Sequence, residues 1–242
     1  MLGSIFEWFS GWFWEPFSAA FLVNNRWLSY FQGVQNTLII SLFAVLLGVA
    51  IGLIIAVVKY FTVRNKKRFI FRILDFICNT YVTIIRSTPV MLQLLIIYNL
   101  IFTSRNTSPL ISAIVCFGIN SGAYVSEIIR AGIESIDKGQ MEAGLSLGLK
   151  SSQGMRLIVL PQAIKNILPA LGNEFIVLVK ETSIAGIIAV TEVLKAAQNI
   201  GNRTYDILPP LFIAAGFYLV IILCLTKLLR TFERRLARGD RK

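Results

Sequence analysis

Long apolar runs separated by short basic stretches constrain this chain more than any other feature of its sequence. A helix needs about 20 apolar residues to cross the hydrocarbon core of a bilayer. Five runs are predicted to do so, and they lie within residues 34–58, 73–102, 110–131, 164–179 and 208–229. Of the 242 residues, 55% are hydrophobic and 15% are charged. We therefore predict an all-α polytopic membrane protein with five transmembrane helices and one domain.

The lysine and arginine residues predict the orientation, because cytoplasmic loops are enriched in them. Most of the 24 lie in three segments, 59–72, 130–165 and 227–242, and the first of these contains no acidic residue. If these segments are cytoplasmic, five spans place the N-terminus outside and the C-terminus in the cytoplasm. The chain is then a multi-pass protein of the cell membrane, in contact with lipid.

Residues 180–207 are not predicted to form a span. Lys180, Glu181, Glu192 and Lys195 leave an apolar part that is too short to cross. We expect a polar break followed by a short helix on the outer half of the membrane. Irregular backbone at membrane depth is tolerated where it is buried in protein or lines an aqueous cavity, as in a translocation pathway.

The N-terminal segment holds all four tryptophans, Trp8, Trp12, Trp14 and Trp27. Such rings favour the membrane–water interface, so residues 4–23 are predicted to lie on the membrane surface as one or more helices. An aromatic segment that packs against the first span fits the sequence equally well. We assign residues 1–32 to this extracytoplasmic, interfacial segment, which does not resemble a cleaved signal peptide.

Several function classes are disfavoured by composition. The net charge is +11. The basic residues that produce it flank apolar spans, so they indicate membrane topology and not nucleic-acid binding. The chain has no histidine, the commonest general base and metal ligand. The cysteines Cys78, Cys116 and Cys224 fall inside apolar runs and are predicted to be small buried hydrophobes. No phosphate-binding P-loop pattern occurs.

The segment between the third and fourth runs contains the stretch MEAGLSLGLKSSQGMRLIVLPQ. Residues 140–149 are predicted to form a short helix in which Met141, Leu145 and Leu149 make an apolar stripe. Gly144 and Gly148 make a neighbouring small face, and Gly148 can end the helix. Such a helix is suited to docking in a groove of another protein, or alternatively to packing on the ends of its own spans.

A second helix is predicted after this one. Ser151 or Ser152 can cap it, and Pro161 interrupts it before the next span.

The same segment resembles the EAA motif of type I ABC importer permeases, with the pattern E-A-A-x3-G-x9-I-x-L-P. The matching residues are Glu142, Ala143, Gly144, Gly148, Ile158, Leu160 and Pro161. Gly144 departs from the pattern by replacing the second alanine. In that family the loop seats in a cleft of an ATPase subunit, so the resemblance implies that these residues couple the spans to ATP hydrolysis.

Further stretches resemble the polar amino acid branch of that family. They are NTLIIS from Asn36, IRSTP from Ile85, SGAYVSEIIRAGIESI from Ser121, LPQAIKNILPALGNEFIVLVKETS from Leu160 and FERRL from Phe232. The resemblance covers about residues 33–237. It implies a MetI-like transmembrane domain over residues 33–231, with a cytoplasmic coupling loop at about 134–162 and a basic tail at 232–242.

The resemblance also implies partners. They are two ATPase subunits on the cytoplasmic side, an extracytoplasmic amino-acid-binding protein, and a second permease copy or a paralogue. ATP and magnesium would bind the ATPase, and this chain would bind no cofactor and hydrolyse nothing itself.

Polar residues inside the spans are the candidates for the substrate pathway. Asn120, Tyr124 and Glu127 share one face of the third span, and Arg86 lies within the second. Arg86 can bind the carboxylate of an amino acid and Glu127 its ammonium group. Alternatively, Glu127 pairs with Arg130 and Arg86 anchors the helix at the surface. Glu181 is a weaker candidate, as are Glu174 and Lys180.

Gly48 and Gly52 form a G-x-x-x-G pattern, which predicts close helix packing within the subunit. Two other classes fit less well than an importer subunit. An ion-coupled secondary transporter often shows two repeated halves, and we find no internal repeat. An intramembrane enzyme needs a metal or nucleophile constellation, and we find none. An importer of another small polar solute remains compatible with the sequence.

Overall fold

The computed structural model describes residues 11, 14–64, 68–102 and 107–238, and every regular element in this part of the chain is a helix. The helices, in chain order, are α2 (Glu15–Phe21), η2 (Val23–Asn25), α3 (Trp27–Arg64), α4 (Phe69–Ser87), α5 (Val90–Ile101), α6 (Pro109–Glu134), α7 (Lys138–Ser146), α8 (Ser151–Gly154), η3 (Met155–Val159), α9 (Leu160–Glu181), η4 (Thr182–Ile188), α10 (Val193–Thr204) and α11 (Leu208–Arg238). The predicted all-α class is confirmed.

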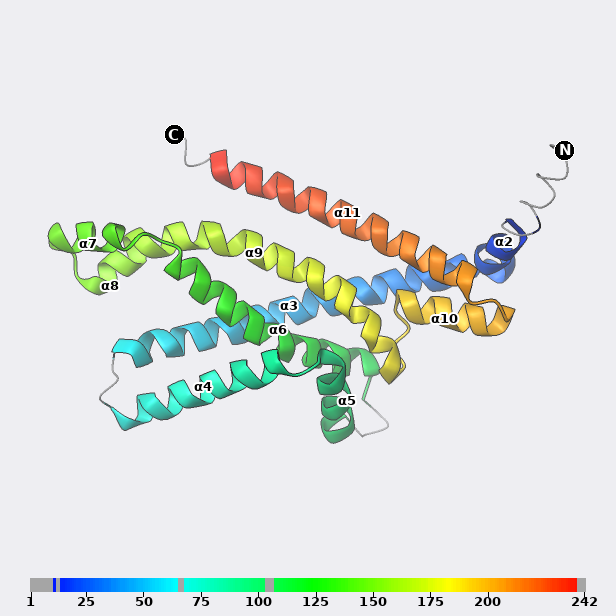
Figure 1. The fold of residues 1–242 in the computed structure, drawn as a ribbon, viewed down its shortest axis with the longest axis horizontal. Helices are drawn as coiled ribbons and strands as arrows, with labels where there is room; N and C mark the ends of the chain where they lie inside the picture. The colour runs from blue at the N-terminus through cyan, green and yellow to red at the C-terminus, as the bar shows by residue number, and fades with distance from the viewer. Residues whose placement is uncertain (1–10, 12–13, 65–67, 103–106, 239–242) are drawn as a thin grey trace.

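The molecule is elongated (Figure 1). Helices α7 and α8 form one end, and α2 and α10 form the other. Helix α3 runs along most of the length, and α11 begins beside α10 and extends back toward the α7 end. The coupling segment and the segment after α9 therefore lie at opposite ends.

Three described helices are long and apolar enough to cross a membrane: Val23–Thr62, Pro109–Glu134 and Leu208–Leu236. The pair Phe69–Ser87 and Val90–Ile101 adds a fourth candidate if it is one broken span, although its two halves meet at 114°. Helix α9 contains the predicted fourth span and has 22 residues, but it carries Lys165, Glu174, Lys180 and Glu181 and is not among these candidates.

Helices α3 and α6 pack closely through glycines on both sides. A Cβ atom on Gly48 would lie 2.7 Å from Ser121 Oγ, and one on Gly52 would lie 2.5 Å from Val125 Cγ1. On α6, a Cβ atom on Gly118 would lie 2.5 Å from Leu47 Cδ2. The predicted close approach at the G-x-x-x-G pattern is thus confirmed, and its partner is a helix of the same chain.

The second apolar run does not form one straight helix. It breaks at Pro89, because a residue before proline avoids the helical region, and Thr88 has an extended backbone. The side-chain nitrogen of Gln93 donates hydrogen bonds to the carbonyl oxygens of Ile85 at 2.8 Å and Thr88 at 3.1 Å. These bonds satisfy carbonyl groups that the end of α4 leaves without helical partners.

The predicted break after the fourth run is also present. Helix α9 continues into η4, and the chain then turns at Ala189, which has a left-handed backbone with φ of 64°. The short helix α10 follows. The structure thus confirms that residues 180–207 do not form one helix.

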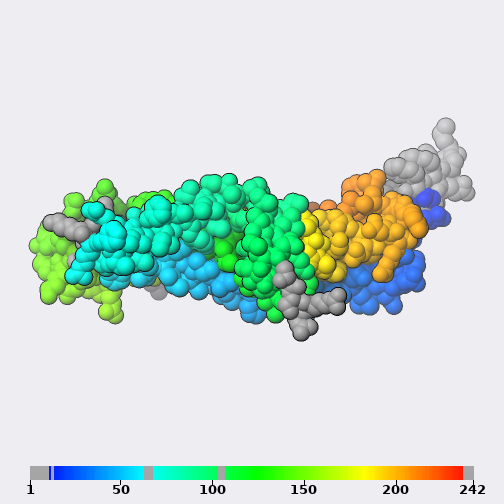
Figure 2. All heavy atoms as spheres, turned by 90° about the horizontal axis from the view of Figure 1, so that it is seen from below, coloured from blue at the N-terminus to red at the C-terminus, as the bar shows by residue number. Residues whose placement is uncertain are grey.

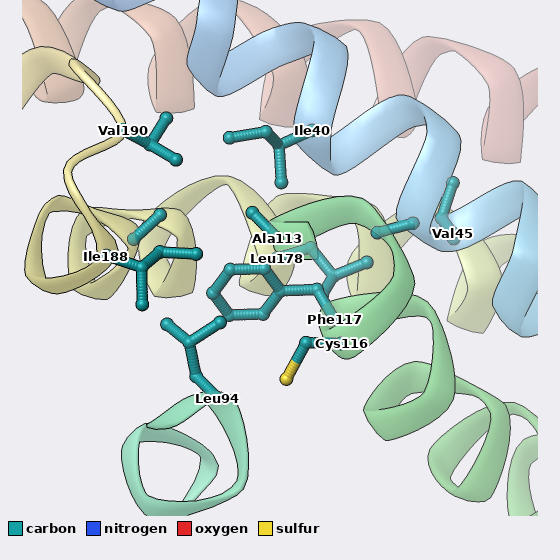
Figure 3. Close-up of a cluster of buried hydrophobic side chains, with 11 residues drawn as sticks. Ile40, Val45, Leu94, Ala113, Cys116, Phe117, Leu178, Ile188 and Val190 are labelled. Atoms are coloured by element: carbon teal, nitrogen blue, oxygen red, sulfur yellow. The ribbon is translucent and has the colours of Figure 1, made fainter. Parts of the chain in front are cut away.

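The two broken segments share one hydrophobic core (Figure 3). Leu94 of α5 lies against Phe117 of α6, and Ile188 and Val190 approach from the segment after α9. In the space-filling view α5 lies between α4 and the segment after α9 (Figure 2). The core therefore joins both interruptions to the continuous helices α3 and α6.

The described part of the N-terminal segment packs on α11 and on the start of α3. Phe17 stacks on Phe212, and Phe21 contacts Tyr30 and Phe217. Trp14 is 61% exposed. Trp8 and Trp12, like most of the predicted surface segment before residue 14, lie outside the described residues.

The prediction for the cysteines is only partly correct. Cys116 is buried, Cys78 is half-buried and Cys224 is exposed, and all three are free thiols. Cys224 lies on α11, which is largely exposed along its length, so an apolar run alone did not distinguish a core helix from one with an open face.

Candidate functional site

The coupling segment folds as a compact helical hairpin at one end of the molecule. Helix α7 begins at Lys138, two residues earlier than predicted, because the side chain of Asp137 accepts a hydrogen bond from the Gly139 amide at 2.7 Å. An acidic N-cap of this kind satisfies a free amide of the first turn. The short helix α8 and the π-helical turn η3 then lead directly into α9.

Gly148 ends α7, as predicted. It has a φ of 85°, a left-handed conformation that only glycine adopts without strain. The amide of Gly148 donates to Leu145 O at 2.9 Å, and the amide of Leu149 donates to Gly144 O at 3.1 Å. This pair of bonds is the Schellman motif that closes many helices. The left-handed backbone at position 148 therefore requires glycine.

Gly144 contributes through close packing. It is buried, and a Cβ atom at this position would lie 2.6 Å from Ile158 Cδ1. Gly144 and Ile158, which are fourteen positions apart in the motif, thus pack against each other. The spacing of the motif brings the first helix onto the turn that precedes α9.

The predicted apolar stripe of α7 is not one exposed face. Met141 and Leu149 turn inward: Met141 Sδ lies 2.7 Å from the Cβ position of Gly154, and Leu149 Cδ1 lies 3.5 Å from that of Gly144. Leu145 is 44% exposed and Leu147 is 85% exposed. The outward surface therefore includes Leu145 and Leu147 with the exposed residues Glu142, Ala143, Ser146 and Gly148.

The second part of the hairpin also differs from prediction. Helix α8 begins after Lys150, whose amide donates to the Gln153 side chain at 2.8 Å, so neither Ser151 nor Ser152 is its cap. Pro161 does not interrupt a helix, because η3 continues directly into α9. It stands in the first turn of α9, directly after η3, where a wider turn suits a residue without an amide hydrogen.

A second group of charged residues lies where α3, α4 and α6 meet. Glu127 Oε2 is 2.9 Å from Arg130 Nη2 and 3.6 Å from Arg86 Nη1, and Glu127 Oε1 is 3.7 Å from Lys59 Nζ. Arg130 also pairs with Glu134. We call these five side chains the charged cluster. It holds three cations and two carboxylates, and Glu127 is the member that contacts cations from all three helices.

The structure brings some of the predicted pathway residues together and separates others. Arg86 and Glu127 are paired, and the Arg86 guanidinium lies 5.4 Å from the centre of the Tyr124 ring. The alternative Glu127–Arg130 pair is also present, and the role of Arg86 and Glu127 in binding the solute stays a prediction.

Asn120 and Glu181 are not part of the charged cluster. Asn120 is buried and donates to the side-chain oxygen of Gln93 at 2.8 Å, so it supports the break between α4 and α5. Glu181 ends α9. Glu174, also on α9, accepts a hydrogen bond from Ser121 Oγ at 2.9 Å.

A cavity of about 640 Å³ lies between the charged cluster and the coupling segment. Lys59 and Arg130 of the cluster line one side, and Ser151 and Met155 of the hairpin line another. Asp75 and Asn79 of α4 add polar groups. The volume is ample for a small polar solute, and the lining connects the charged residues to the coupling segment.

Sequence reasoning missed Gln93 and Lys59 as members of these networks. The sequence predicts Lys59 in a basic loop, whereas the structure places it in α3, and nothing in its local sequence places it beside Glu127, 68 positions further along the chain. For Gln93 a signal was available: it is a polar residue inside an apolar run, and a polar group at membrane depth needs a partner.

Comparison with known proteins finds consistent similarities. Residues 48–238 match the family described as binding-protein-dependent transport system inner membrane component. The arginine transport system permease protein ArtQ of Bacillus subtilis (strain 168) is 38% identical over 86% of this chain and 93% of that protein. The glutamine transport system permease protein GlnP of Escherichia coli (strain K12) is 36% identical over 85% of this chain and 91% of that protein.

Solved structures of ABC transporters are also similar to this chain. The crystal structure of an amino acid ABC transporter with histidines has a chain that is 42% identical, with a TM-score of 0.78 over 86% of this chain and 94% of that chain. An inward-facing structure of the MetNI methionine ABC transporter is 21% identical with a TM-score of 0.69, over 90% of this chain and 99% of that one. The second likeness concerns the fold alone.

Proposed function

Because this chain belongs to the family of binding-protein-dependent transport system inner membrane components, we propose that it is the permease subunit of an ATP-driven importer of polar amino acids. The observation that carries the proposal is the coupling hairpin, in which the motif glycines close α7 and seat it on Ile158. The relatives named for arginine, glutamine and cystine transport support amino acids as the substrate class.

In this proposal the hairpin is the contact with an ATPase subunit on the cytoplasmic side. Its outward face carries the exposed apolar side chains Leu145 and Leu147, which suit a groove on a partner. The inward residues hold α7 to α8 and η3, and η3 continues into α9, so a movement of the partner is passed along this connection to α9. ATP and magnesium bind the ATPase, and this chain hydrolyses nothing.

The proposed assembly contains a second permease copy or a paralogue, two ATPase subunits and an extracytoplasmic amino-acid-binding protein, all in the cell membrane or at its surface. The chain crosses five times, with α9 as the fourth span and the α4–α5 pair as a broken second span. The charges of α9 are tolerated because α9 packs against α6 and α11, and Glu174 has a partner on α6.

The charged cluster is the proposed contact for the substrate backbone. Arg86 binds the carboxylate and Glu127 the ammonium group, so an arriving amino acid replaces the direct Arg86–Glu127 contact at 3.6 Å. The exchange preserves charge, because each group trades one ionic partner for another. The surplus cation of the cluster favours the carboxylate end of the solute. The adjoining cavity receives the solute on the way to the coupling segment.

The test of the proposal is purification of the tagged chain from its native membrane. ATPase subunits should co-purify, and the reconstituted complex with its binding protein should hydrolyse ATP faster when a polar amino acid is added. Stimulation by a different small polar solute and by no amino acid would change the substrate class. Absence of any ATPase in the purified complex would contradict the proposal.

Orientation has a separate test. With the three native cysteines replaced, Lys66→Cys should react with a membrane-impermeant thiol reagent only in inverted vesicles. Labelling of Lys66→Cys on intact cells would contradict the cytoplasmic placement of residues 59–72. Lys66 itself lies outside the described residues.

A further inference from the structure

The segment after α9 is held in place by one buried carboxylate. Glu192 has no exposed surface, although a carboxylate is expensive to bury without partners. It accepts hydrogen bonds from the amides of Leu194 at 2.7 Å and Lys195 at 2.6 Å, and so caps α10. It also accepts a hydrogen bond from the Tyr218 hydroxyl of α11 at 2.9 Å. A single side chain thus joins α10 to α11.

Helix α3 closes the other side of this segment. A Cβ atom on Gly33 would lie 2.9 Å from the backbone of both Glu192 and Val193, so the helix and the segment touch through their main chains. The Asn36 side chain donates to the Thr191 carbonyl at 2.8 Å. Residues 191–193 are therefore clamped between α3 and α11.

The Tyr218 hydroxyl is the point at which the surrounding elements meet. Thr37 on α3 and Thr182 on η4 are both buried, and the Thr182 hydroxyl donates to the Val179 carbonyl at 2.8 Å. A cavity of about 340 Å³ is lined by Tyr218, Leu194 of α10, Ala214 of α11 and Lys180 of α9 among others.

The clamped segment belongs to the core that contains the other interruption. Ile188 and Val190 pack with Leu94 of α5 (Figure 3). Helix α5 lies near the middle of the long axis, and α10 continues from this region to the end opposite the coupling hairpin (Figure 1). Broken helices at membrane depth are tolerated where they line a pathway. A movement of residues 182–193 would change the packing of both breaks together.

We propose that Glu192 is a positioning residue that holds residues 182–193 closed against α3 and α11, and that its hydrogen bond from Tyr218 is the latch released when the pathway opens at this end. This inference rests on the proposed function. It assigns no contact between Glu192 and the solute. A weaker latch should make the open state more populated, so that ATP hydrolysis depends less on the binding protein.

Tyr218→Phe tests the latch, because it removes the hydroxyl and leaves the ring and both amide bonds to Glu192. In the reconstituted complex without binding protein, ATP hydrolysis by Tyr218→Phe should rise about tenfold over wild type, the effect of losing one hydrogen bond to a charged group. Glu192→Gln keeps one acceptor oxygen but places an NH2 group against a backbone amide that donates to Glu192, so it disturbs the cap of α10 as well and should give at least as large a rise.

Tyr30→Phe is the matched control. Tyr30 is fully buried, whereas Tyr218 is half-buried, and the Tyr30 hydroxyl donates to α11 as well, to the Pro210 carbonyl at 3.3 Å and not to Glu192. Its unstimulated hydrolysis should equal wild type. A role confined to stability would lower the melting temperature and reduce both unstimulated and stimulated hydrolysis in Tyr218→Phe. That result, or an equal rise in Tyr30→Phe, would overturn the proposal.

Hydrogen exchange of the purified permease gives a second measurement that needs no ATPase. Amides in residues 189–196 should exchange faster in Tyr218→Phe than in wild type or Tyr30→Phe, because the cap of α10 is no longer anchored to α11. Unchanged exchange would overturn the latch even if transport were altered. Failure of ATPase subunits to co-purify with wild type would instead contradict the proposed function, while this measurement still decides the latch.

Discussion

The coupling hairpin and the charged cluster are built in opposite ways. In the hairpin, residues within one short stretch of chain contact one another, and its two key glycines act through backbone conformation and close packing. In the cluster, Lys59, Arg86 and Glu127 come from three helices and meet only through side chains. The hairpin is therefore predicted to respond to changes in shape and the cluster to changes in charge.

The largest effect should follow removal of the central charge of the cluster. Glu127→Gln leaves three cations with Glu134 as their remaining carboxylate in the cluster, and because these side chains are partly exposed, each of the three lost ion pairs is worth at most about 1 kcal/mol. Both the amount of assembled permease and its uptake should fall, as measured by immunoblot and transport of labelled amino acid. Glu134→Gln is the control, because Glu134 is 62% exposed and contacts Arg130 alone. Equal losses in both variants would mean that Glu127 has no central role.

Arg86→Ala should separate transport from assembly. Lys59 and Arg130 still balance Glu127, so ATPase subunits should still co-purify. Binding of the substrate carboxylate should weaken by at least about 2 kcal/mol, which is roughly a thirtyfold loss of affinity. Arg86→Lys should restore part of it, since an ammonium group lacks the planar fork of arginine.

The measurement is uptake of two different amino acids in membranes with equal assembly. Arg203→Ala, at an exposed position near the end of α10, is the control. Unchanged uptake in Arg86→Ala would remove Arg86 from the pathway, and loss of only one substrate would assign it to side-chain recognition.

Substitutions at Gly148 should have a smaller effect on transport. Two causes of this effect can be separated: backbone strain within the chain and a clash with a partner protein. The structure gives a Cβ atom at this position open space, so within the chain the cost comes from the left-handed backbone, about 1–2 kcal/mol for any non-glycine residue. Gly148→Ala and Gly148→Leu should therefore lower the melting temperature of the isolated permease equally.

Transport by the two variants then tests whether Gly148 lies against a partner protein. If the hairpin seats in a tight cleft, Gly148→Leu should transport less than Gly148→Ala at equal membrane levels. Wild-type transport by Gly148→Leu would show that this glycine does not lie at an interface.

The smallest effect is expected at Gly144. The nearest atom to an added Cβ is Ile158 Cδ1, the flexible end of a side chain, and alanine favours a helix over glycine by about 1 kcal/mol. Gly144→Ala should thus change the stability by less than about 1 kcal/mol and leave transport intact. It also restores the alanine of the motif that the sequence resembles.

Gly52→Ala provides the contrast, because its Cβ atom would meet the backbone nitrogen of Ser126 at 2.9 Å, which cannot turn away. Thermal unfolding of the two variants in detergent should place Gly52→Ala well below Gly144→Ala. The reverse order would contradict the packing described for both glycines.

Much of the helical layout was predictable, because apolar runs and their interruptions act locally. The third and fifth runs begin within one residue of α6 and α11, and the polar break after α9 lies where charged residues end the apolar pattern. Two features were not predictable in this way. Pro89 marks the break between α4 and α5 locally, but no local signal gives the 114° angle between the two helices, and the first helix extends beyond both ends of the predicted run.

What the sequence by itself determined is the class of the protein, the helix-ending role of Gly148 and the resemblance of the coupling motif, since these depend on composition, backbone preference and spacing along the chain. Only the tertiary structure decided which side of α7 faces outward, that Lys59 joins Arg86 and Arg130 around Glu127, and that Glu192 meets Tyr218. These contacts join residues far apart in sequence, and the short-range forces that make them act only after helix packing has brought the side chains within reach.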